Sequence, residues 1–315
     1  MRRLFATGAL LLASACSTAS DGKTSAGRDT VVVYGAASLT GAMRAALDSF
    51  SRRTGAVVSE EHGGSLELAR RIIDLRRVPD VIALADQEVF PELLVPDAMS
   101  WYAAFARNRM VVAYTDRSRY AADVTPDTWR RIVLRPDVLL GRTDPAIAPA
   151  GYRTLLMYKL AERFYKEAGL AAKLEAKTPA SLVRGNAAEL AALLTAGELD
   201  YIIEYESLAR AQKLKFVPLP SEIDLGDPAR AQSYAEVSVR VSNGHDSVTR
   251  RGAPILYGVS VPRAAPHAAS GVRFVDFLLG TDGRAILQRA YVDALDHAQM
   301  IGDSVPSQLR ASAAP

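Results

Sequence analysis

The sequence predicts an α/β fold of two lobes, in which each lobe holds a mostly parallel β-sheet flanked by helices. Short runs rich in β-branched residues alternate with amphipathic segments along the chain, a pattern typical of parallel strands joined by helices. The chain has 315 residues, of which 49% are apolar, so it is long enough for two hydrophobic cores. Two apolar runs, Met110–Tyr114 and Ile255–Val261, are suited to carry the chain between the lobes, and two such crossings form a hinge.

The N-terminus has the features of a secretory leader. Two arginines precede the apolar run Leu4–Ala13, which is too short to span a bilayer, so we expect residues 1–15 to be a signal peptide. The run ends in small residues before Cys16, the only cysteine, which predicts lipidation there; the alternative is an ordinary cleavage site beside a chance cysteine. Residues 16–28 are rich in Ser, Thr, Gly and Ala and predict a flexible tether. The expected location is therefore periplasmic or otherwise extracytoplasmic, with the lipid as the only membrane anchor.

The first lobe begins with a strand, a loop of small residues and a helix. The strand is expected at Val31–Tyr34, and apolar residues from Leu39 onward recur at helical spacing. Ser38 stands just before this helix as a candidate N-cap. Gly63-Gly64-Ser65 precedes a second amphipathic run in the same way, and Asp80–Ala85 is the next predicted strand.

The second lobe repeats the arrangement. A loop that ends at Gly151-Tyr152-Arg153 leads into an amphipathic helix, and the predicted strand Asp200–Tyr205 carries the carboxylate of Glu204 near its end. Since the carboxyl edge of a sheet faces the cleft between lobes, we expect Glu204 to face that cleft. The predicted boundaries are 29–112 with 257–312 for the first lobe and 113–256 for the second.

Three of these loops share the ingredients of an oxyanion site. Each feeds a helix N-terminus, where backbone N–H groups lack partners and the helix dipole favours negative charge. Ser38 and Ser65 add hydroxyl donors without a full positive charge. The alternative is that these residues only cap their helices.

The same residues carry a resemblance to a known family. The chain resembles the tungstate/molybdate-binding proteins of ABC importers from about Val31 to Arg310, with the matching motifs in consistent order. The motifs are Gly35-Ala36-Ala37-Ser38-Leu39, Gly63-Gly64-Ser65, Trp101 to Asn108, Val111 to Tyr120, Gly151-Tyr152-Arg153 and Leu199 to Tyr205. The resemblance implies a type II periplasmic-binding-protein fold with a hinge of two crossover strands. It also implies a monomer that holds an oxyanion, needs no cofactor and docks on a permease with its cytoplasmic ATPase.

The resemblance implies roles for particular positions. Ser38, Gly64 and Ser65 match the hydroxyl and amide donors of the first lobe, and Tyr152 and Arg153 match a turn of the second lobe whose backbone meets the ligand. A further match is Glu204, the position of a carboxylate that places oxygen on the metal of the oxyanion.

One position departs from the family. An acidic residue usually stands directly before the proline of the Pro-x-Gly-Tyr-Arg turn, whereas this chain has Ala148 before Pro149. Either Asp144 in the same loop supplies the second oxygen to the metal, or the coordination number is lower, or the ligand differs. The alternative ligands are sulfate, phosphate or a small organic acid, and a receptor that senses its ligand without transport is a further alternative.

Composition and motifs argue against other functions. The chain has 38 basic and 35 acidic residues, so it has no charge excess of the kind that nucleic-acid binding requires. It contains neither Gly-x-Ser-x-Gly nor Gly-x-x-x-x-Gly-Lys, and we therefore do not expect an enzyme.

Overall fold

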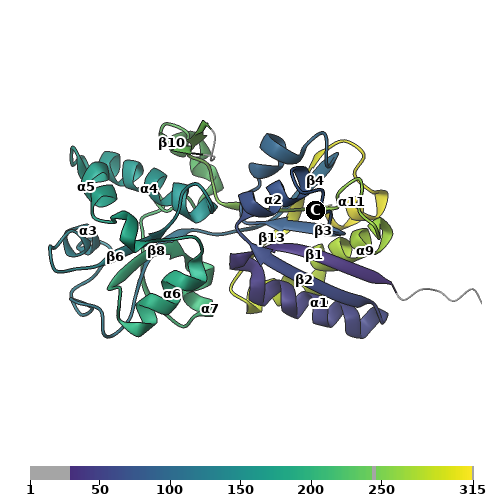
Figure 1. The fold of residues 1–315 in the computed structure, drawn as a ribbon, viewed down its shortest axis with the longest axis horizontal. Coiled ribbons are helices and arrows are strands. Elements are labelled where there is room, and N and C mark those ends of the chain that lie inside the picture. Colours follow the sequence, from purple (N-terminus) through teal and green to yellow (C-terminus); the bar gives the residue numbers. More distant parts are fainter. Residues whose placement is uncertain (1–28, 243–245, 314–315) are drawn as a thin grey trace, which may run out of the picture.

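The structure, a computed structural model, describes residues 29–242 and 246–313. The predicted signal peptide, the tether and Cys16 lie outside the described residues. The described chain forms two lobes joined by a narrow waist, and each lobe is a β-sheet with helices packed on it (Figure 1). The two-lobed α/β fold predicted from the sequence is therefore confirmed.

The first lobe contains a six-stranded sheet in the order β13-β4-β12-β3-β1-β2. Along β1, Val31 and Val33 pack with α1 while Tyr34 packs with α2 on the opposite face, since side chains alternate across a strand. The strands are β1 (Thr30–Ala36), β2 (Val57–Gly63), β3 (Val81–Leu84), β4 (Trp101–Arg107), β12 (Leu256–Ser260) and β13 (Asp293–Gly302). The helices are the 3-10 turn η1 (Ala37–Leu39), α1 (Thr40–Thr54), α2 (Ser65–Ile73), the π-helical turn η2 (Phe90–Leu94), α9 (Ala268–Leu279), α10 (Thr281–Arg289) and α11 (Ser307–Ala313).

The second lobe contains a five-stranded sheet in the order β7-β6-β8-β5-β9 and a separate hairpin of β10 and β11. Its strands are β5 (Met110–Tyr114), β6 (Leu140–Thr143), β7 (Val183–Arg184), β8 (Tyr201–Tyr205), β9 (Lys215–Pro218), β10 (Ser238–Ser242) and β11 (Ser247–Arg251). Its helices are α3 (Trp129–Val133), α4 (Pro149–Tyr165), α5 (Leu170–Ala176), η3 (Ala180–Leu182), α6 (Ala187–Ala196), α7 (Glu206–Ala211), η4 (Pro228–Arg230) and α8 (Ala231–Tyr234). Residues of α6 and α7 share one buried cluster with β5 and β8, and α4 packs with the other cluster.

Both sheets are mixed rather than mostly parallel, which corrects the prediction. In the first lobe β1 pairs parallel with β2 and β3, but β12 pairs antiparallel with β3 and β4. In the second lobe β6 pairs parallel with β7 and β8, whereas β5 is antiparallel to its neighbours. The cause is the hinge: the chain leaves the first lobe through β4 and returns through β12, so these neighbouring strands must run in opposite directions.

The first crossover lies at Asn108 and Arg109, between β4 and β5. The predicted boundary after residue 112 falls inside β5, which pairs with β8 and β9 of the second sheet. The return crossover occupies residues 252–255, and β12 begins at Leu256, one residue before the predicted start of the last segment. The two crossovers touch, since the Asn108 N–H donates to the Ile255 carbonyl at 3.1 Å.

Candidate functional site

A small cavity lies between the lobes where several helices begin. Its volume is about 30 Å³, far below the roughly 300–1,000 Å³ of clefts that hold drug-sized ligands. The site therefore suits a group of few atoms. The first lobe contributes Ala36, Ala37, Ser38, Gly63, Gly64, Ser65 and Ala85, and the second contributes Thr143, Ala148, Pro149, Ala150, Gly185, Asn186, Ala187, Glu204 and Tyr205.

Helix N-termini from both lobes surround this cavity. The first turns of α2, α4 and α6 border it, and so does η1, which leads into α1. Because the first N–H groups of a helix have no intrahelical acceptor, several backbone donors and the positive ends of several dipoles converge on one small volume. This arrangement favours an anion.

Glu204 is the acidic side chain of the cavity. It is 1% exposed, its Oε1 accepts a hydrogen bond from the Tyr205 N–H at 3.0 Å, and its Oε2 has no partner among the described residues. Burial penalises the charged form and raises the pKa of Glu204 to about 7, although the bond from Tyr205 opposes the shift. A buried polar atom without a partner is costly, so Oε2 is available to a ligand.

Thr143 supplies a second unpaired polar atom in the cavity. It ends β6, is fully buried, and its Oγ1 has no hydrogen-bond partner within residues 29–242 and 246–313. Together with Glu204 Oε2, this hydroxyl gives the second lobe two side-chain oxygens that are satisfied only if something occupies the cavity.

Both predicted serines line the cavity, but neither caps a helix. Ser38 lies within η1, and α1 begins at Thr40 with Leu39 as its N-cap. Ser65 is the first residue of α2, because Gly64 takes the N-cap position. The Ser65 Oγ accepts a bond from the Ala85 N–H at 3.0 Å, so its own proton remains available as a donor.

Gly64 lies where the lobes touch. A Cβ atom at this position would come within 2.6 Å of the Ile147 carbonyl oxygen in the second lobe. Only glycine permits this approach of the two backbones, so a larger residue at position 64 would push the lobes apart beside the cavity.

Tyr152 and Arg153 do not line the cavity. The helix α4 begins at Pro149, so both residues lie inside it rather than in a turn. Arg153 instead joins the lobes: its guanidinium lies 2.7 Å from the Asp86 carboxylate and donates to the Ala85 carbonyl and the Tyr205 hydroxyl, each at 2.8 Å. The residue holds the lobes together next to the site.

Asp144 is also absent from the cavity wall. Its Oδ1 accepts a bond from the Ala146 N–H at 2.8 Å within its own loop, and the residue borders a different cavity. Ala148 does line the site and is the N-cap of α4, without any side-chain cap. The departure from the family therefore concerns a position at the cavity itself.

Sequence reasoning missed the start of α6. Asn186 and Ala187 line the cavity, and the Asn186 Oδ1 caps the helix by accepting a bond from the Glu189 N–H at 3.0 Å. The pattern of Asn followed by Glu three residues later is a capping signal that could have located this helix start. Thr143 carried no comparable signal, because its position depends on how β6 meets the other lobe.

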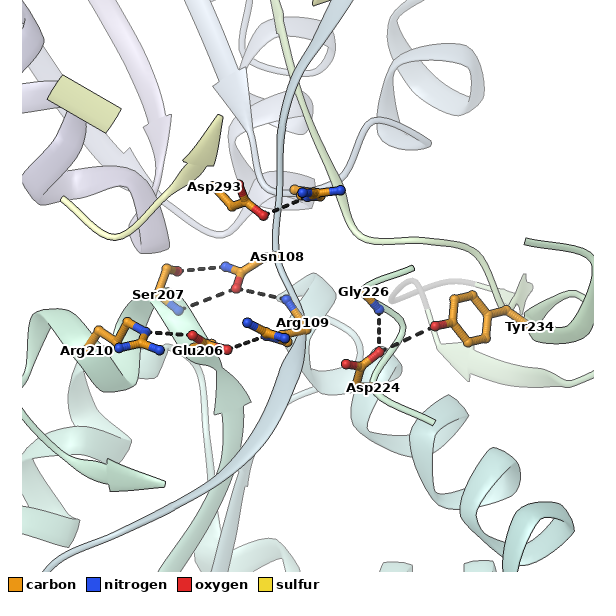
Figure 2. A network of polar contacts seen from close by, with 10 residues as sticks. Asn108, Arg109, Glu206, Ser207, Arg210, Asp224, Gly226, Tyr234 and Asp293 are labelled. Carbon is orange, nitrogen blue, oxygen red and sulfur yellow. Dashed lines mark hydrogen bonds and ion pairs between the residues drawn. The ribbon is translucent and has the colours of Figure 1, made fainter. Parts of the chain in front are cut away.

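A larger cavity of about 340 Å³ lies at the hinge (Figure 2). Most of its charged side chains form ion pairs: Glu206 with Arg109 and Arg210, Asp293 with Arg107, and Asp227 with Arg230. Asp224, also in the lining, accepts hydrogen bonds from the Gly226 N–H and the Tyr234 hydroxyl. Among the described residues, no buried side-chain oxygen or nitrogen of its lining lacks a hydrogen-bond partner, in contrast to Glu204 and Thr143 in the small cavity. The small cavity between the lobes is therefore the better candidate for binding a ligand.

No helix among residues 29–242 and 246–313 has the length and apolar character needed to cross a membrane. In the same described residues, no group of three or more His, Cys, Asp or Glu side chains is placed to hold a metal cation.

Comparisons with known proteins agree with this geometry. Residues 31–291 match the family described as bacterial extracellular solute-binding protein. An uncharacterized solute-binding protein of Petrotoga mobilis is 39% identical over 261 residues, covering 82% of this chain and 81% of its own length. The molybdate/tungstate-binding protein WtpA of Thermococcus kodakarensis is 31% identical over 339 residues, covering 98% and 95%.

Among solved structures, the periplasmic molybdate-binding protein of Azotobacter vinelandii has a TM-score of 0.59 at 16% identity, covering 83% of this chain and 98% of its own. This likeness shows the two-lobed fold alone. The region that matches the family, residues 31–291, spans both lobes. The chain therefore belongs to the bacterial extracellular solute-binding protein family.

Proposed function

We propose that this protein captures molybdate or tungstate outside the cytoplasm and delivers it to the permease of an ABC importer. In this proposal a monomer closes its two lobes around the oxyanion. Lipidated Cys16 holds it at the membrane, and the loaded form docks on a permease that works with a cytoplasmic ATPase. The relatives named as molybdate/tungstate-binding proteins support the choice of ligand.

The observation that carries the proposal is Glu204 Oε2, an oxygen unpaired within the described residues, in a small cavity bordered by helix N-termini. A carboxylate repels the oxygens of a simple anion, so it fits an anion site in two ways: it carries a proton, or it binds the central atom. Molybdenum and tungsten accept an additional oxygen ligand, whereas sulfur in sulfate does not. We assign Glu204 as an oxygen ligand to the metal of the bound oxyanion.

The remaining contacts come from donors. Ser38 and Ser65, the Gly64 backbone and the first turns of α2, α4 and α6 are placed to bind the oxyanion oxygens. We propose no direct role for the side chains of Tyr152, Arg153 or Asp144. Arg153 acts by holding Ala85 and Tyr205, which line the cavity.

Calorimetric titration with tungstate, molybdate, sulfate and phosphate tests the proposal. Wild-type protein is expected to bind the first two more tightly than the last two. Ser38→Ala and Ser65→Ala are each expected to weaken binding by about 1–3 kcal/mol, the usual range for a lost hydrogen bond to a charged group. The matched control is Ser51→Ala, because Ser51 donates to the Ala56 carbonyl away from the cavity. Tighter binding of sulfate or phosphate, or serine variants that titrate like wild type, would contradict the proposal.

A further inference from the structure

The amide of Asn108 has a fixed orientation at the hinge. Its Oδ1 accepts bonds from the backbone N–H groups of Arg109, at 2.9 Å, and Ser207, at 3.4 Å (Figure 2). Backbone N–H groups can only donate, so the oxygen of the amide must face them. The NH₂ group then faces two hydroxyl oxygens, those of Ser207 and Tyr257, each 2.6 Å away.

The direction of the next bond follows from this orientation. Since Asn108 Nδ2 can only donate, the Tyr257 hydroxyl oxygen accepts from it and must direct its own proton elsewhere. The Ser38 Oγ lies 3.2 Å from the Tyr257 hydroxyl and accepts that proton. Tyr257 is fully buried on β12, so water does not compete for the bond.

The last residue in this series of hydrogen bonds borders the candidate site. Ser38 lines the cavity, and once its oxygen accepts from Tyr257, its own proton is left to point elsewhere. Each hydrogen bond of the series is donated toward the cavity: the Asn108 amide donates to Tyr257, and Tyr257 donates to Ser38. Successive bonds of this kind polarise one another, so Ser38 becomes a stronger donor than an isolated serine.

We propose that Asn108 and Tyr257 are positioning residues that aim the Ser38 hydroxyl at the bound oxyanion and link the ligand to the hinge. The inference rests on the proposed oxyanion function. The link to the hinge arises because the partners of Asn108 come from both lobes. Tyr257 and Ser38 belong to the first lobe, whereas Ser207 lies in α7 of the second. A change in the angle between the lobes therefore alters the contacts that orient Ser38.

A double-mutant cycle with Tyr257→Phe and Ser38→Ala tests the proposal by calorimetry with tungstate. Tyr257→Phe removes one hydroxyl and keeps the buried ring. It is expected to lower the affinity about tenfold when Ser38 is present and less than about twofold in the Ser38→Ala background. Equal effects of Tyr257→Phe in both backgrounds, or no effect in either, would overturn the proposed relay, that is, the series of hydrogen bonds from Asn108 through Tyr257 to Ser38. Such a result is expected if the Tyr257 proton goes to the Ser207 Oγ instead.

The matched control is Tyr234→Phe, which removes a buried hydroxyl that donates to the Ser221 carbonyl near the hinge cavity. It is expected to leave tungstate affinity unchanged. Asn108→Asp is a second variant, since a carboxylate accepts from Tyr257 and reverses the relay. It should also lower affinity only while Ser38 is present.

The same double-mutant cycle is also measured by thermal unfolding without ligand. This second measurement separates the proposed oxyanion-binding function from the proposed hydrogen bonds that run through Tyr257 to Ser38. Coupling between Tyr257 and Ser38 in the ligand-free protein, with no binding of any oxyanion by wild type, would contradict the proposed function while leaving the hydrogen bond in place. Oxyanion binding by wild type without coupling in either measurement would contradict the relay alone.

Discussion

At the scale of single residues, the site depends on polar atoms that the fold leaves unsatisfied. Within the part of the chain that the structure describes, Glu204 and Thr143 each keep one oxygen without a partner in a cavity lined by both lobes. Such atoms destabilise the empty protein, and a ligand that pairs with them recovers that free energy. The free energy that these unpaired oxygens cost the ligand-free protein is regained on binding, and it therefore contributes to the affinity for the ligand.

Glu204 makes this cost dependent on pH. Burial raises its pKa from 4.5 to about 7, so the folded protein binds a proton more tightly than the unfolded chain. The free energy of unfolding is then expected to fall as pH rises from about 4.5 to 7 and to stay low above 7. The full effect is on the order of 3 kcal/mol, from about 1.4 kcal/mol per pKa unit.

Glu204→Gln removes the ionisable group and keeps the shape. Without oxyanion, this variant is expected to melt at a higher temperature than wild type at pH 8 and at nearly the same temperature at pH 4.5. Thermal unfolding followed by circular dichroism at both pH values measures the difference. Equal melting temperatures at pH 8 would show that the carboxylate is not penalised by burial.

At the scale of elements, the positions of the strands were easier to predict than the ends of the helices. Met110–Tyr114 was predicted with the bounds that β5 has, because a short β-branched run bounded by polar residues has few alternatives. The serines were assigned as N-caps from residue type alone, whereas Leu39 and Gly64 occupy those positions. The backbone dihedral angles that decide a cap are set by packing and are not encoded in residue type.

The N-terminus of α4 gives a prediction about ligand choice. Ala148 is the N-cap of a 17-residue helix and lines the cavity that contains Glu204. Ala148→Asp is expected to raise stability by about 1 kcal/mol through capping. It also places a second carboxylate at the cavity, so tungstate binding should be preserved or improved while sulfate binding is unchanged or weaker. Titration with both anions measures this selectivity.

The control for this substitution is Ala268→Asp. Ala268 is the first residue of α9, is exposed and does not line the cavity. A carboxylate there also interacts favourably with a helix N-terminus, through the helix dipole and not as an N-cap, and should change neither affinity. If Ala148→Asp strengthens sulfate binding, or abolishes tungstate binding in a folded protein, the assignment of a metal-ligating carboxylate site is wrong.

At the scale of the whole molecule, side chains from both lobes hold the closed form together. The buried ion pair between Arg153 and Asp86 crosses the interface, and Arg250 of the second lobe pairs with Glu92 of the first. The motif Gly151-Tyr152-Arg153 indicated a ligand turn, but the Arg153 guanidinium binds Ala85 and Asp86 of the other lobe as well as Tyr205 of its own. Contacts of this kind require the relative placement of two lobes, which local sequence patterns do not contain.

The two-lobed arrangement itself could be predicted from the alternation of strands and helices. The mixed character of the sheets could not, because the antiparallel pairs arise where β4 and β12 enter and leave the hinge. Glu204 illustrates both cases. Its place in the cavity follows from its position near the end of a strand, whereas its unpaired Oε2 depends on neighbours from six other segments of the chain.

The location of the whole molecule depends on Cys16. Cys16→Ser is expected to move the protein from the membrane fraction to the soluble fraction, because acylation of that thiol is the proposed anchor. Fractionation followed by immunoblotting measures the shift, with Ser17→Ala as the neighbouring control. Continued membrane association of the Cys16→Ser protein would contradict the proposed lipid anchor.

X-ray absorption at the tungsten edge tests the central claim most directly, because it counts the oxygens around the metal in the bound oxyanion. We predict more than four oxygen neighbours in the wild-type complex and a smaller number in Glu204→Gln. Four oxygens in both proteins would contradict the assignment of Glu204 as a metal ligand, and would mean that hydrogen-bond donors alone hold the anion.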